Sequence, residues 1–254
     1  MNLSLAIPMI LGWLSGWLVN YLADVLPVTR SFSRPACAHC QAAFRWSDFL
    51  FFRNCTSCGK PRGLRTIFAQ AILTVVPIWM WIIPRAGFPF ILAFILFIYL
   101  SLVFIIDLEH RLILHPVSIA GAILGLGIGI YLRGGTSLAN GIKSTLIGGA
   151  VGFGIMLVFY FVGEGYVRYM SKKRGMSTDE VALGFGDVNL SGILGLLLGW
   201  PAISAGLLFA VLAGGLISLF IIVRMLISKK YKAFTAIPYA PFLIISALFL
   251  LYVV

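Results

Sequence analysis

Long apolar runs alternate with short polar connectors along this chain. A helix that crosses the hydrocarbon layer of a bilayer needs about 20 predominantly apolar residues. Runs of about this length, or somewhat shorter, cover residues 4–23, 66–84, 88–106, 112–132, 144–163, 189–200, 202–223 and 236–253. The sixth run is the shortest, and Asp187 stands just before it. The pattern predicts an all-α polytopic membrane protein with about eight transmembrane helices.

The composition agrees with a membrane protein. Hydrophobic residues make up 61% of the 254 residues and charged residues only 11%, whereas soluble domains carry about 25% charged residues. The first apolar run has no basic segment before it and no small-residue cleavage site after it. We therefore expect it to be a membrane span and not a cleavable signal peptide.

The net charge of +11 is distributed unevenly. Of the 19 basic residues, 16 lie in the first, third, fifth and seventh connectors between the apolar runs. The other three, Arg85, Arg133 and Lys143, lie in the second and fourth connectors. Connectors rich in lysine and arginine stay on the cytoplasmic side of a membrane. We therefore predict that these connectors are cytoplasmic and that both termini lie outside. The basic excess then indicates topology and contact with anionic lipid, not a nucleic-acid partner.

The one long polar insertion, residues 28–65, follows the first apolar run. It divides the chain into a first transmembrane helix (1–27), a small cytoplasmic loop (28–65) and a membrane-embedded domain (66–254). We call residues 28–65 the cysteine loop because the segment contains all four cysteines of the chain, Cys37, Cys40, Cys55 and Cys58.

The four cysteines form two C-x-x-C pairs, a spacing that is typical of a closed tetrahedral zinc site with a structural role. Gly59, directly after the second pair, suits the tight turn that such a site needs. A cytoplasmic loop lies in a reducing compartment, which disfavours disulfides. Four unrelated free thiols and a redox dithiol are the alternatives. His39 is not counted as a ligand because four cysteines already complete the site.

Two aspartates stand where apolar runs begin or end. Asp107 ends the third run in LVFIIDLEHRLI, and Asp187 precedes the sixth in LGFGDVNL. Taken singly, each can be an acid at a helix end, where the bilayer tolerates it. Taken together, they are predicted to meet at the cytoplasmic face. Gly184 and Gly186 leave room beside Asp187 for the backbone of an extended peptide.

A pair of adjacent carboxylates is suited to general acid–base chemistry. Two carboxylates a few ångströms apart cannot both ionise cheaply, so the pair shares a proton. One carboxylate can then take a proton from water while the other donates to a peptide carbonyl. The sequence holds no other recognisable catalytic set and no phosphate-binding glycine loop. Asp107 and Asp187 are therefore the predicted catalytic residues.

Motifs along nearly the whole chain resemble those of the type IV prepilin peptidases, the bacterial branch of the GxGD membrane aspartyl proteases. In chain order the matching residues are Gly16, Asn20, Leu26–Pro27, the four cysteines, Trp46, Asp48, Asp107–Ile113, Gly184–Asp187 and Ile237–Phe242. Pro238, Tyr239 and Pro241 within the last motif also suggest that a helix begins near the aspartates.

The resemblance implies an aspartic endopeptidase in the bacterial cytoplasmic membrane. Its substrates would be prepilins or pseudopilins of a type IV pilus or a protein secretion system, from which it removes a basic leader at the cytoplasmic face. The implied partners are these substrates and the lipid bilayer, with no nucleic acid. The implied cofactors are a structural zinc ion and, for methylation of the new N-terminus, S-adenosylmethionine. Residues for methyl transfer stay unknown.

Three positions depart from the family pattern. The proline often found seven residues after the first aspartate is Leu114, and Pro116 follows two residues later. Asn189 replaces a lysine, which removes a positive charge close in sequence to Asp187. Gln70 replaces a glutamate, and this change bears on methyl transfer but not on proteolysis.

Two other functions are compatible with single features of the sequence. A proton- or cation-coupled transporter also uses membrane acids and glycine-broken helices, and it predicts acids near the midplane and repeated halves. Neither is found here. A non-enzymatic scaffold for pilus or secretion assembly would use the cysteine loop to hold a partner, and it predicts that the aspartates are dispensable.

Overall fold

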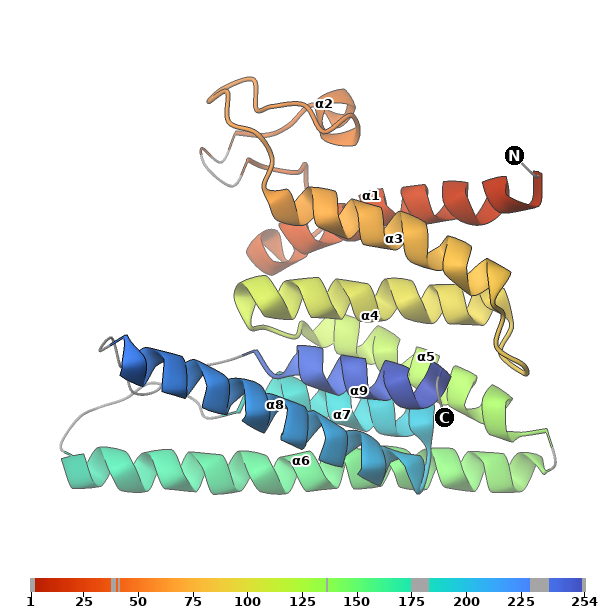
Figure 1. Cartoon of the computed structure of the whole chain (residues 1–254), viewed down its shortest axis with the longest axis vertical. Coiled ribbons are helices and arrows are strands. Elements are labelled where there is room, and N and C mark those ends of the chain that lie inside the picture. Colours follow the sequence, from red (N-terminus) through yellow and green to blue (C-terminus); the bar gives the residue numbers. More distant parts are fainter. Residues whose placement is uncertain are drawn as a thin grey trace. The chain divides into compact units, whose positions relative to one another are not determined.

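The computed structural model describes residues 3–37, 40, 42–135, 137–174, 183–228 and 238–252. These described residues form nine α-helices and no strand (Figure 1). The helices are α1 (Leu3–Thr29), α2 (Trp46–Leu50), α3 (Leu64–Ile82), α4 (Phe90–His110), α5 (His115–Arg133), α6 (Leu138–Arg174), α7 (Phe185–Leu198), α8 (Ala202–Ile227) and α9 (Ala240–Tyr252). The all-α prediction is confirmed.

Each of the eight predicted apolar runs corresponds to one helix, and the short α2 lies within the cysteine loop. The expected number of full-length spans needs correction, however. Among the described residues, six helices are long and apolar enough to cross a membrane. The other two, α7 and α9, have 14 and 13 residues, or about 21 Å and 20 Å at 1.5 Å per residue. Each is shorter than the hydrocarbon layer of about 30 Å.

The short length of α7 has a local cause at each end. Gly184 caps its first turn, and Gly199 stops its last turn with a left-handed φ of +69°, a conformation that favours glycine. The first two residues of the predicted eighth run, 236–237, lie outside the described residues, and α9 begins at Ala240.

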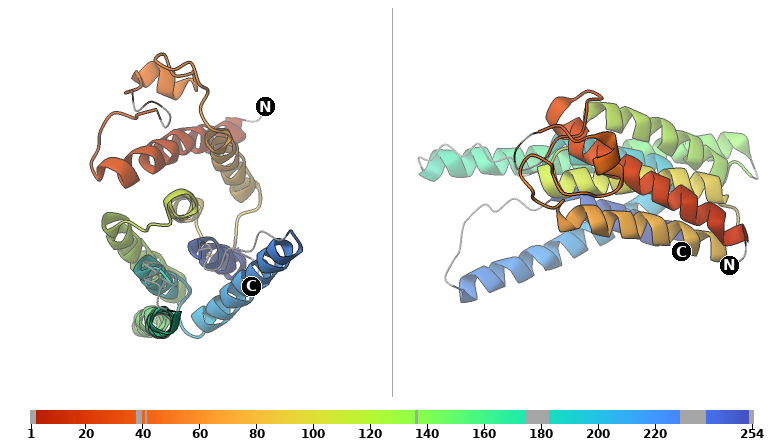
Figure 2. Two further views of the ribbon diagram at one scale, coloured as in Figure 1. Left: turned by 90° about the vertical axis from the view of Figure 1, so that its left-hand side faces the viewer. Right: turned by 90° about the horizontal axis from the view of Figure 1, so that it is seen from above.

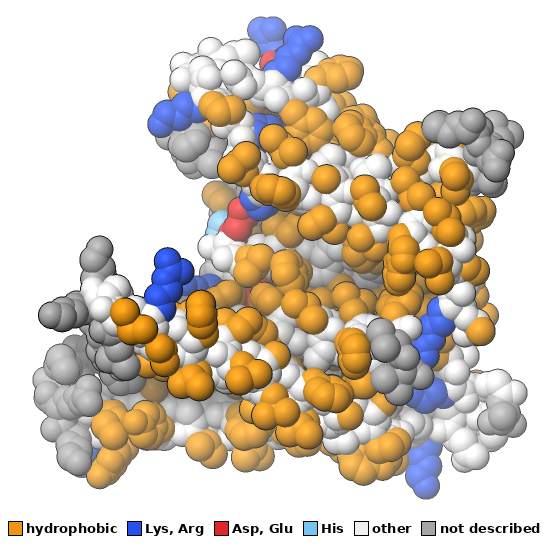
Figure 3. Space-filling model, viewed as in Figure 1, with side chains coloured by type: hydrophobic (Ala, Val, Ile, Leu, Met, Phe, Trp, Pro, Cys, Tyr) orange, Lys and Arg blue, Asp and Glu red, His pale blue; other side chains and the backbone are white. Residues whose placement is uncertain are grey.

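Large hydrophobic side chains cover the outward faces of the long helices, as the surfaces over α3 and α8 show (Figure 3). On α8, for example, Leu216 is 68% exposed and Phe220 is 67% exposed. Contiguous apolar surface of this extent is suited to lipid. Together with the six long apolar helices, it makes the chain a multi-pass membrane protein.

The chain packs as two compact units, Met1–Ile106 and Asp107–Val254. In the first unit, α1 packs against α3. Gly12 lies so close to α3 that a Cβ there would be 2.6 Å from the carbonyl oxygen of Leu73. These units are groups of residues that pack together. The predicted division after residues 27 and 65 is based on the expected function of each segment, and it stays a prediction.

In the second unit, α7 packs against α5, α6, α8 and α9 (Figure 2, left). Glycines let these backbones approach closely, as small residues do in membrane helix pairs. Gly148 of α6 lies against Gly195 of α7, and a Cβ on Gly125 of α5 would be 2.9 Å from the carbonyl oxygen of Ile193. Glycines therefore form several of the helix contacts around α7.

Arg133 joins three helices of the second unit at the end opposite Asp187. Its guanidinium donates to the carbonyl oxygens of Gly129 on α5 and Leu197 on α7, and to Thr145 Oγ1 on α6 at 3.2 Å. A cation at helix C-termini compensates the partial negative charge of their carbonyls. Arg133 therefore holds the C-terminal end of the short α7 in place.

Candidate active site and metal centre

Asp107 lies in the last turn of α4, where the chain turns sharply out of the helix. Arg111 follows α4 in the left-handed conformation with φ +51°, and its backbone N–H donates to the carbonyl oxygen of Asp107 at 2.9 Å. A bond of this kind closes the last turn of many helices, usually with glycine in the left-handed position. The turn fixes Asp107 at the helix end.

Asp187 is the third residue of α7 and closes the first turn of that helix. Its backbone N–H donates to the carbonyl oxygen of Gly184 at 3.0 Å, and its carboxylate accepts a hydrogen bond from the backbone N–H of Gly184. The bond from the Gly184 N–H to the Asp187 side chain is the half of a capping box that a glycine N-cap can make. The G-F-G-D tetrad thus has a local structural role, which is to hold the Asp187 carboxylate at the helix N-terminus.

The start of α9 touches both aspartates. The backbone N–H of Ala240, the first residue of α9, donates to the carboxylate of Asp107. Tyr239 lies close enough to Asp187 to interact with it electrostatically. The expectation that a helix begins beside the aspartates is confirmed. Because helix N-termini carry partial positive charge, the starts of α7 and α9 favour carboxylates here.

Asp107 and Asp187 are brought together and buried, with 4% and 8% of their surface exposed. They are close enough for the charge of Asp107 to act on Asp187. Asp107 Oδ2 and Asp187 Oδ1 have no hydrogen-bond partner among the described residues. Each carboxylate therefore accepts a backbone N–H hydrogen bond and has one buried oxygen without a hydrogen-bond partner among the described residues. This is an arrangement in which a proton can be shared.

The two glycines of the tetrad differ in their surroundings. A Cβ on Gly186 would lie 2.8 Å from Cβ of Ile113, so the missing side chain makes room for the connector between α4 and α5. A Cβ on Gly184 would meet only Asp187 Oδ2 at 3.4 Å and the backbone nitrogen of Gly186 at 3.9 Å. Of the two, Gly184 is thus the position that leaves space for an approaching peptide.

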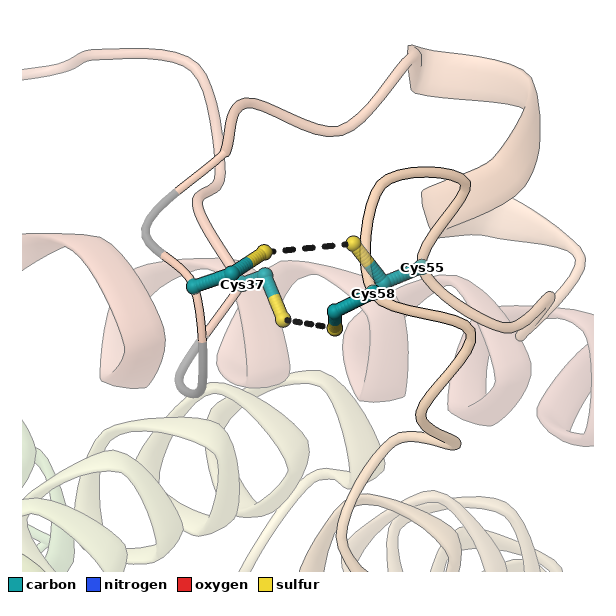
Figure 4. A group of neighbouring side chains, drawn as sticks. Cys37, Cys55 and Cys58 are labelled. Carbon is teal, nitrogen blue, oxygen red and sulfur yellow. Dashed lines mark hydrogen bonds between the residues drawn. The ribbon is translucent and has the colours of Figure 1, made fainter.

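The four cysteines come together in the first unit. All four sulfur atoms lie within 4.8 Å of one another, and Cys37, Cys55 and Cys58 point toward one centre in Figure 4. Cys37 Sγ is 3.7 Å from Cys58 Sγ, and Cys40 Sγ is 3.6 Å from Cys55 Sγ. A tetrahedral ion with metal–sulfur bonds of about 2.3 Å separates its ligands by about 3.8 Å. The donor set and its spacing therefore fit a zinc ion.

A tight turn and backbone hydrogen bonds hold the second cysteine pair in a conformation and a charge state that suit metal binding. Gly59 adopts a φ of +69° and donates its N–H to the carbonyl oxygen of Cys55 at 2.8 Å, as its place after the second pair predicted. Backbone N–H groups of Cys58 and Ser57 lower the pKa of Cys55 to about 6. Thiolate is the form that binds a metal, so these bonds favour the ligand state.

A small aromatic core attaches the metal-site residues to α1. Phe44 and Phe49 pack with Cys37 and Cys55, and Tyr21 of α1 packs against this cluster. The Tyr21 hydroxyl also donates to the carbonyl oxygen of Ser33 at 2.8 Å. The cysteine loop is thus a folded element docked on α1.

An ion-pair network that the sequence reasoning missed lies beneath the same loop. Asp24 of α1 accepts hydrogen bonds from Arg62, at 3.0 Å, and from Arg65. The Arg62 guanidinium also lies 4.0 Å from the ring centroid of Phe49, a cation–π contact. The only signal in the sequence was an acid at the end of the first apolar run and two arginines before the second.

The fold and the site define the class of protein. The chain is a helical, multi-pass membrane protein with a pair of buried carboxylates at helix ends in one unit and a four-cysteine centre in the other.

Comparisons with known proteins identify the family. The sequence profile described as the type IV leader peptidase family matches residues 94–219. The chain is 30% identical over 226 residues to the prepilin leader peptidase/N-methyltransferase of Legionella pneumophila, covering 85% of this chain and 70% of that protein. It is 25% identical over 221 residues to the protein of the same description from Myxococcus xanthus, covering 83% and 61%. No solved structure matches the chain. The chain belongs to the type IV leader peptidase family.

Proposed function

We propose that this chain is a membrane aspartyl endopeptidase that removes basic leader peptides from prepilin-like substrates, with Asp107 and Asp187 as its catalytic residues. One observation carries the proposal. Two carboxylates from distant parts of the sequence meet in a buried site, and each keeps one oxygen without a partner among the described residues. Family membership supports the same activity.

The anchored and available oxygens indicate how the pair acts. The N–H groups of Ala240 and Gly184 orient the two carboxylates, and each carboxylate keeps for the reaction one buried oxygen without a hydrogen bond from any described residue. The ionised carboxylate takes a proton from a water molecule, which attacks the peptide carbonyl. The protonated carboxylate donates to the carbonyl oxygen, and a proton then passes to the departing amine. No covalent enzyme intermediate is needed.

The position of the pair supports a cut at the membrane boundary. Within the second unit, the C-terminal ends of α6 and α8 and the last turn of α4 lie at the same end as the starts of α5, α7 and α9 (Figure 1). The basic residues of alternate connectors support a cytoplasmic location for this end. A prepilin with a basic cytoplasmic leader and an apolar helix in the bilayer would present its scissile bond here. The membrane is then the bacterial inner membrane.

Cleavage is tested by expressing the protein together with a prepilin in cells that lack another leader peptidase. We expect the pilin to lose its leader, which mass spectrometry detects as a defined mass loss at the N-terminus. An uncut prepilin beside correctly inserted protein would contradict the proposal.

The four-cysteine centre is proposed to hold one structural zinc ion. Four thiolates around one tetrahedral ion leave no open position for substrate, so the zinc would stabilise the cysteine loop and take no part in cleavage. The aromatic core under the loop and the Asp24–Arg62 pair support this role, because they complete a small folded element around the sulfurs.

Methylation of the new N-terminus is proposed as a second, separable activity, with S-adenosylmethionine as the methyl donor. It is supported by the two relatives from Legionella pneumophila and Myxococcus xanthus, which are both described as prepilin leader peptidase/N-methyltransferase. The donor is proposed to bind against the cysteine loop and the adjoining helix ends, where arginines and lysines suit its carboxylate. The mass of the mature pilin N-terminus distinguishes a methylated from an unmethylated product.

The contacts of Gln70 change the expectation for that position. Gln70 is only 4% exposed. Its amide nitrogen donates to the carbonyl oxygen of Trp13 at 2.8 Å, and its amide oxygen accepts from Asn20 at 3.4 Å. A Cβ on Gly16 would lie 2.5 Å from this side chain. Gln70 is therefore a tightly packed link between α1 and α3, and both ends of its amide are used.

From these contacts we expect Gln70→Glu to destabilise the first unit by about 1–3 kcal/mol, because a carboxylate cannot donate to the Trp13 carbonyl and is repelled by it. Gln70→Met is the matched control. Methionine has a similar shape and no charge that the Trp13 carbonyl would repel. Gln70→Met should therefore reduce stability less than Gln70→Glu, although glutamate resembles glutamine more closely. Thermal unfolding of the two variants measures the difference. Equal or greater stability of Gln70→Glu would contradict the structural role and favour a direct role in methyl transfer.

The two alternative functions lack support. The aspartates lie at helix ends and not in the middle of long spans, which a transporter with a midplane site would require. The comparisons name neither a transporter nor a scaffold.

A further inference from the structure

A groove of about 350 Å³ opens between α5, α6 and α7 in the second unit. Its volume lies at the lower end of the range of about 300–1,000 Å³ that is typical of small-molecule sites. His115, Ser118 and Asn189 line it together with apolar residues that include Ala122, Phe153 and Leu196. Neither Asp107 nor Asp187 lines the groove.

The groove is polar at one end and apolar at the other. Gly125 lies against Ile193 and Gly129 against Leu196, so α5 and α7 run in the same direction and begin at the same end. His115 and Ser118 belong to the first turn of α5, and Asn189 is the fifth residue of α7. The residues that follow along both helices, such as Ala122 and Leu196, are apolar. The polar groups therefore gather at the end where the aspartates lie.

The polar end contains a buried hydroxyl without a partner. Ser118 is 8% exposed, and its Oγ has no hydrogen-bond partner among the described residues. A buried hydroxyl left in this state costs about 1–3 kcal/mol, so a bound group with a hydrogen-bond acceptor would stabilise the site. His115 and Asn189 stand beside it as further polar contacts.

The groove faces away from the catalytic pair. Successive residues of an α-helix turn by about 100°, so Asn189 projects about 200° from Asp187 around α7. A peptide held for cleavage must reach Asp187, and the groove lies on the other side of the helix. A lysine at position 189, which is common in the family, would also point into this groove. The change to asparagine therefore affects the groove more directly than it affects the carboxylate pair.

We propose that this groove binds one glycerophospholipid. An acyl chain lies along the apolar part, and the ester and glycerol oxygens lie at His115, Ser118 and Asn189. Helices α5 and α6 are long and apolar enough to cross a membrane, so the open side of the groove faces acyl chains. The order from polar to apolar along the groove matches a lipid whose headgroup lies at the predicted cytoplasmic surface. The proposal does not depend on peptidase activity.

Lipid retention tests the proposal. The full-length protein is reconstituted with phosphatidylethanolamine and phosphatidylglycerol, extracted in mild detergent and analysed by native mass spectrometry. We expect one phospholipid to stay bound. Ala122→Phe fills the groove and should reduce retention at least about tenfold, while Ser118→Ala should reduce affinity about two- to tenfold, the value of one hydrogen bond. Ile123→Phe is the matched control because Ile123 is 67% exposed and lies outside the groove lining; it should retain the lipid.

Equal retention by Ala122→Phe and the unaltered protein, or no retained lipid in the unaltered protein, would overturn the proposal. If Ala122→Phe does not fold, photocrosslinking replaces it as the test. Benzoylphenylalanine is introduced at Ile119, which lines the groove and is 58% exposed. In vesicles that also contain a prepilin, an adduct with the mass of a phospholipid supports the lipid site. An adduct with the prepilin, or with neither, contradicts it.

Discussion

Asp107→Asn and Asp187→Asn are each expected to abolish leader cleavage while leaving the protein folded. An amide cannot exchange a proton in the way the pair requires, and loss of general acid–base catalysis lowers rates by about 10²–10⁴-fold. The amide oxygen can still accept the backbone hydrogen bond that anchors each side chain, from Ala240 or from Gly184. Asparagine therefore removes the proton exchange but keeps the anchoring hydrogen bond, whereas alanine removes both. The assay is leader removal by mass spectrometry, with thermal unfolding measured in parallel.

The control for this prediction lies two residues from the first aspartate. Glu109→Gln removes a charge from an exposed position of the same helix and should leave substantial cleavage. Alanine at either aspartate should also abolish cleavage and, in addition, remove the anchoring bond. Near-normal processing by either asparagine variant would exclude the carboxylate pair as the catalytic centre, even if the protein proves to be a peptidase.

Loss of a single cysteine is expected to release the metal and loosen the cysteine loop. Purified protein should contain about one zinc ion per chain, and Cys37→Ser should reduce this strongly. Binding of zinc to four thiolates contributes about 10–16 kcal/mol in small zinc domains, so the aromatic core of Phe44 and Phe49 should become exposed to protease and denaturant. The cysteines belong to the first unit and both aspartates to the second, so the effect on stability should exceed the effect on peptide-bond chemistry.

Ser57→Ala provides the matched control for the metal site. Ser57 lies in the same turn and contributes its backbone N–H to Cys55, which the substitution preserves, so zinc should stay bound. Because the bound ligands are thiolates, protons compete with zinc, and acidification should release the ion. Metal analysis that finds no zinc in carefully reduced protein would contradict the site. A disulfide within the loop would contradict its predicted cytoplasmic location.

The sequence determined the features that depend on local patterns. Each run of apolar residues predicted a helix, so the order of the eight apolar helices followed from the chain alone, although α7 and α9 are shorter than a full span. Alternating basic connectors predicted which helix ends share a side, and in the second unit the ends of α6 and α8 do lie with the starts of α5, α7 and α9. The C-x-x-C spacing predicted that four sulfurs would meet, because each pair forms its own tight turn around one centre. Proline and tyrosine before Ala240 marked the start of α9.

Only the tertiary structure decided which faces of these helices meet. A helix that is apolar all round gives no indication of its buried side, and in a membrane the contacts depend on close packing more than on hydrophobicity. The sequence therefore could not show that Gly186 makes room for Ile113, that Gln70 links α1 to α3, or that Asn189 lines a groove between α5, α6 and α7. Nor could it show that Ala240 and Gly184 hold the carboxylates, because those bonds exist only once Asp107 and the starts of α7 and α9 have come together.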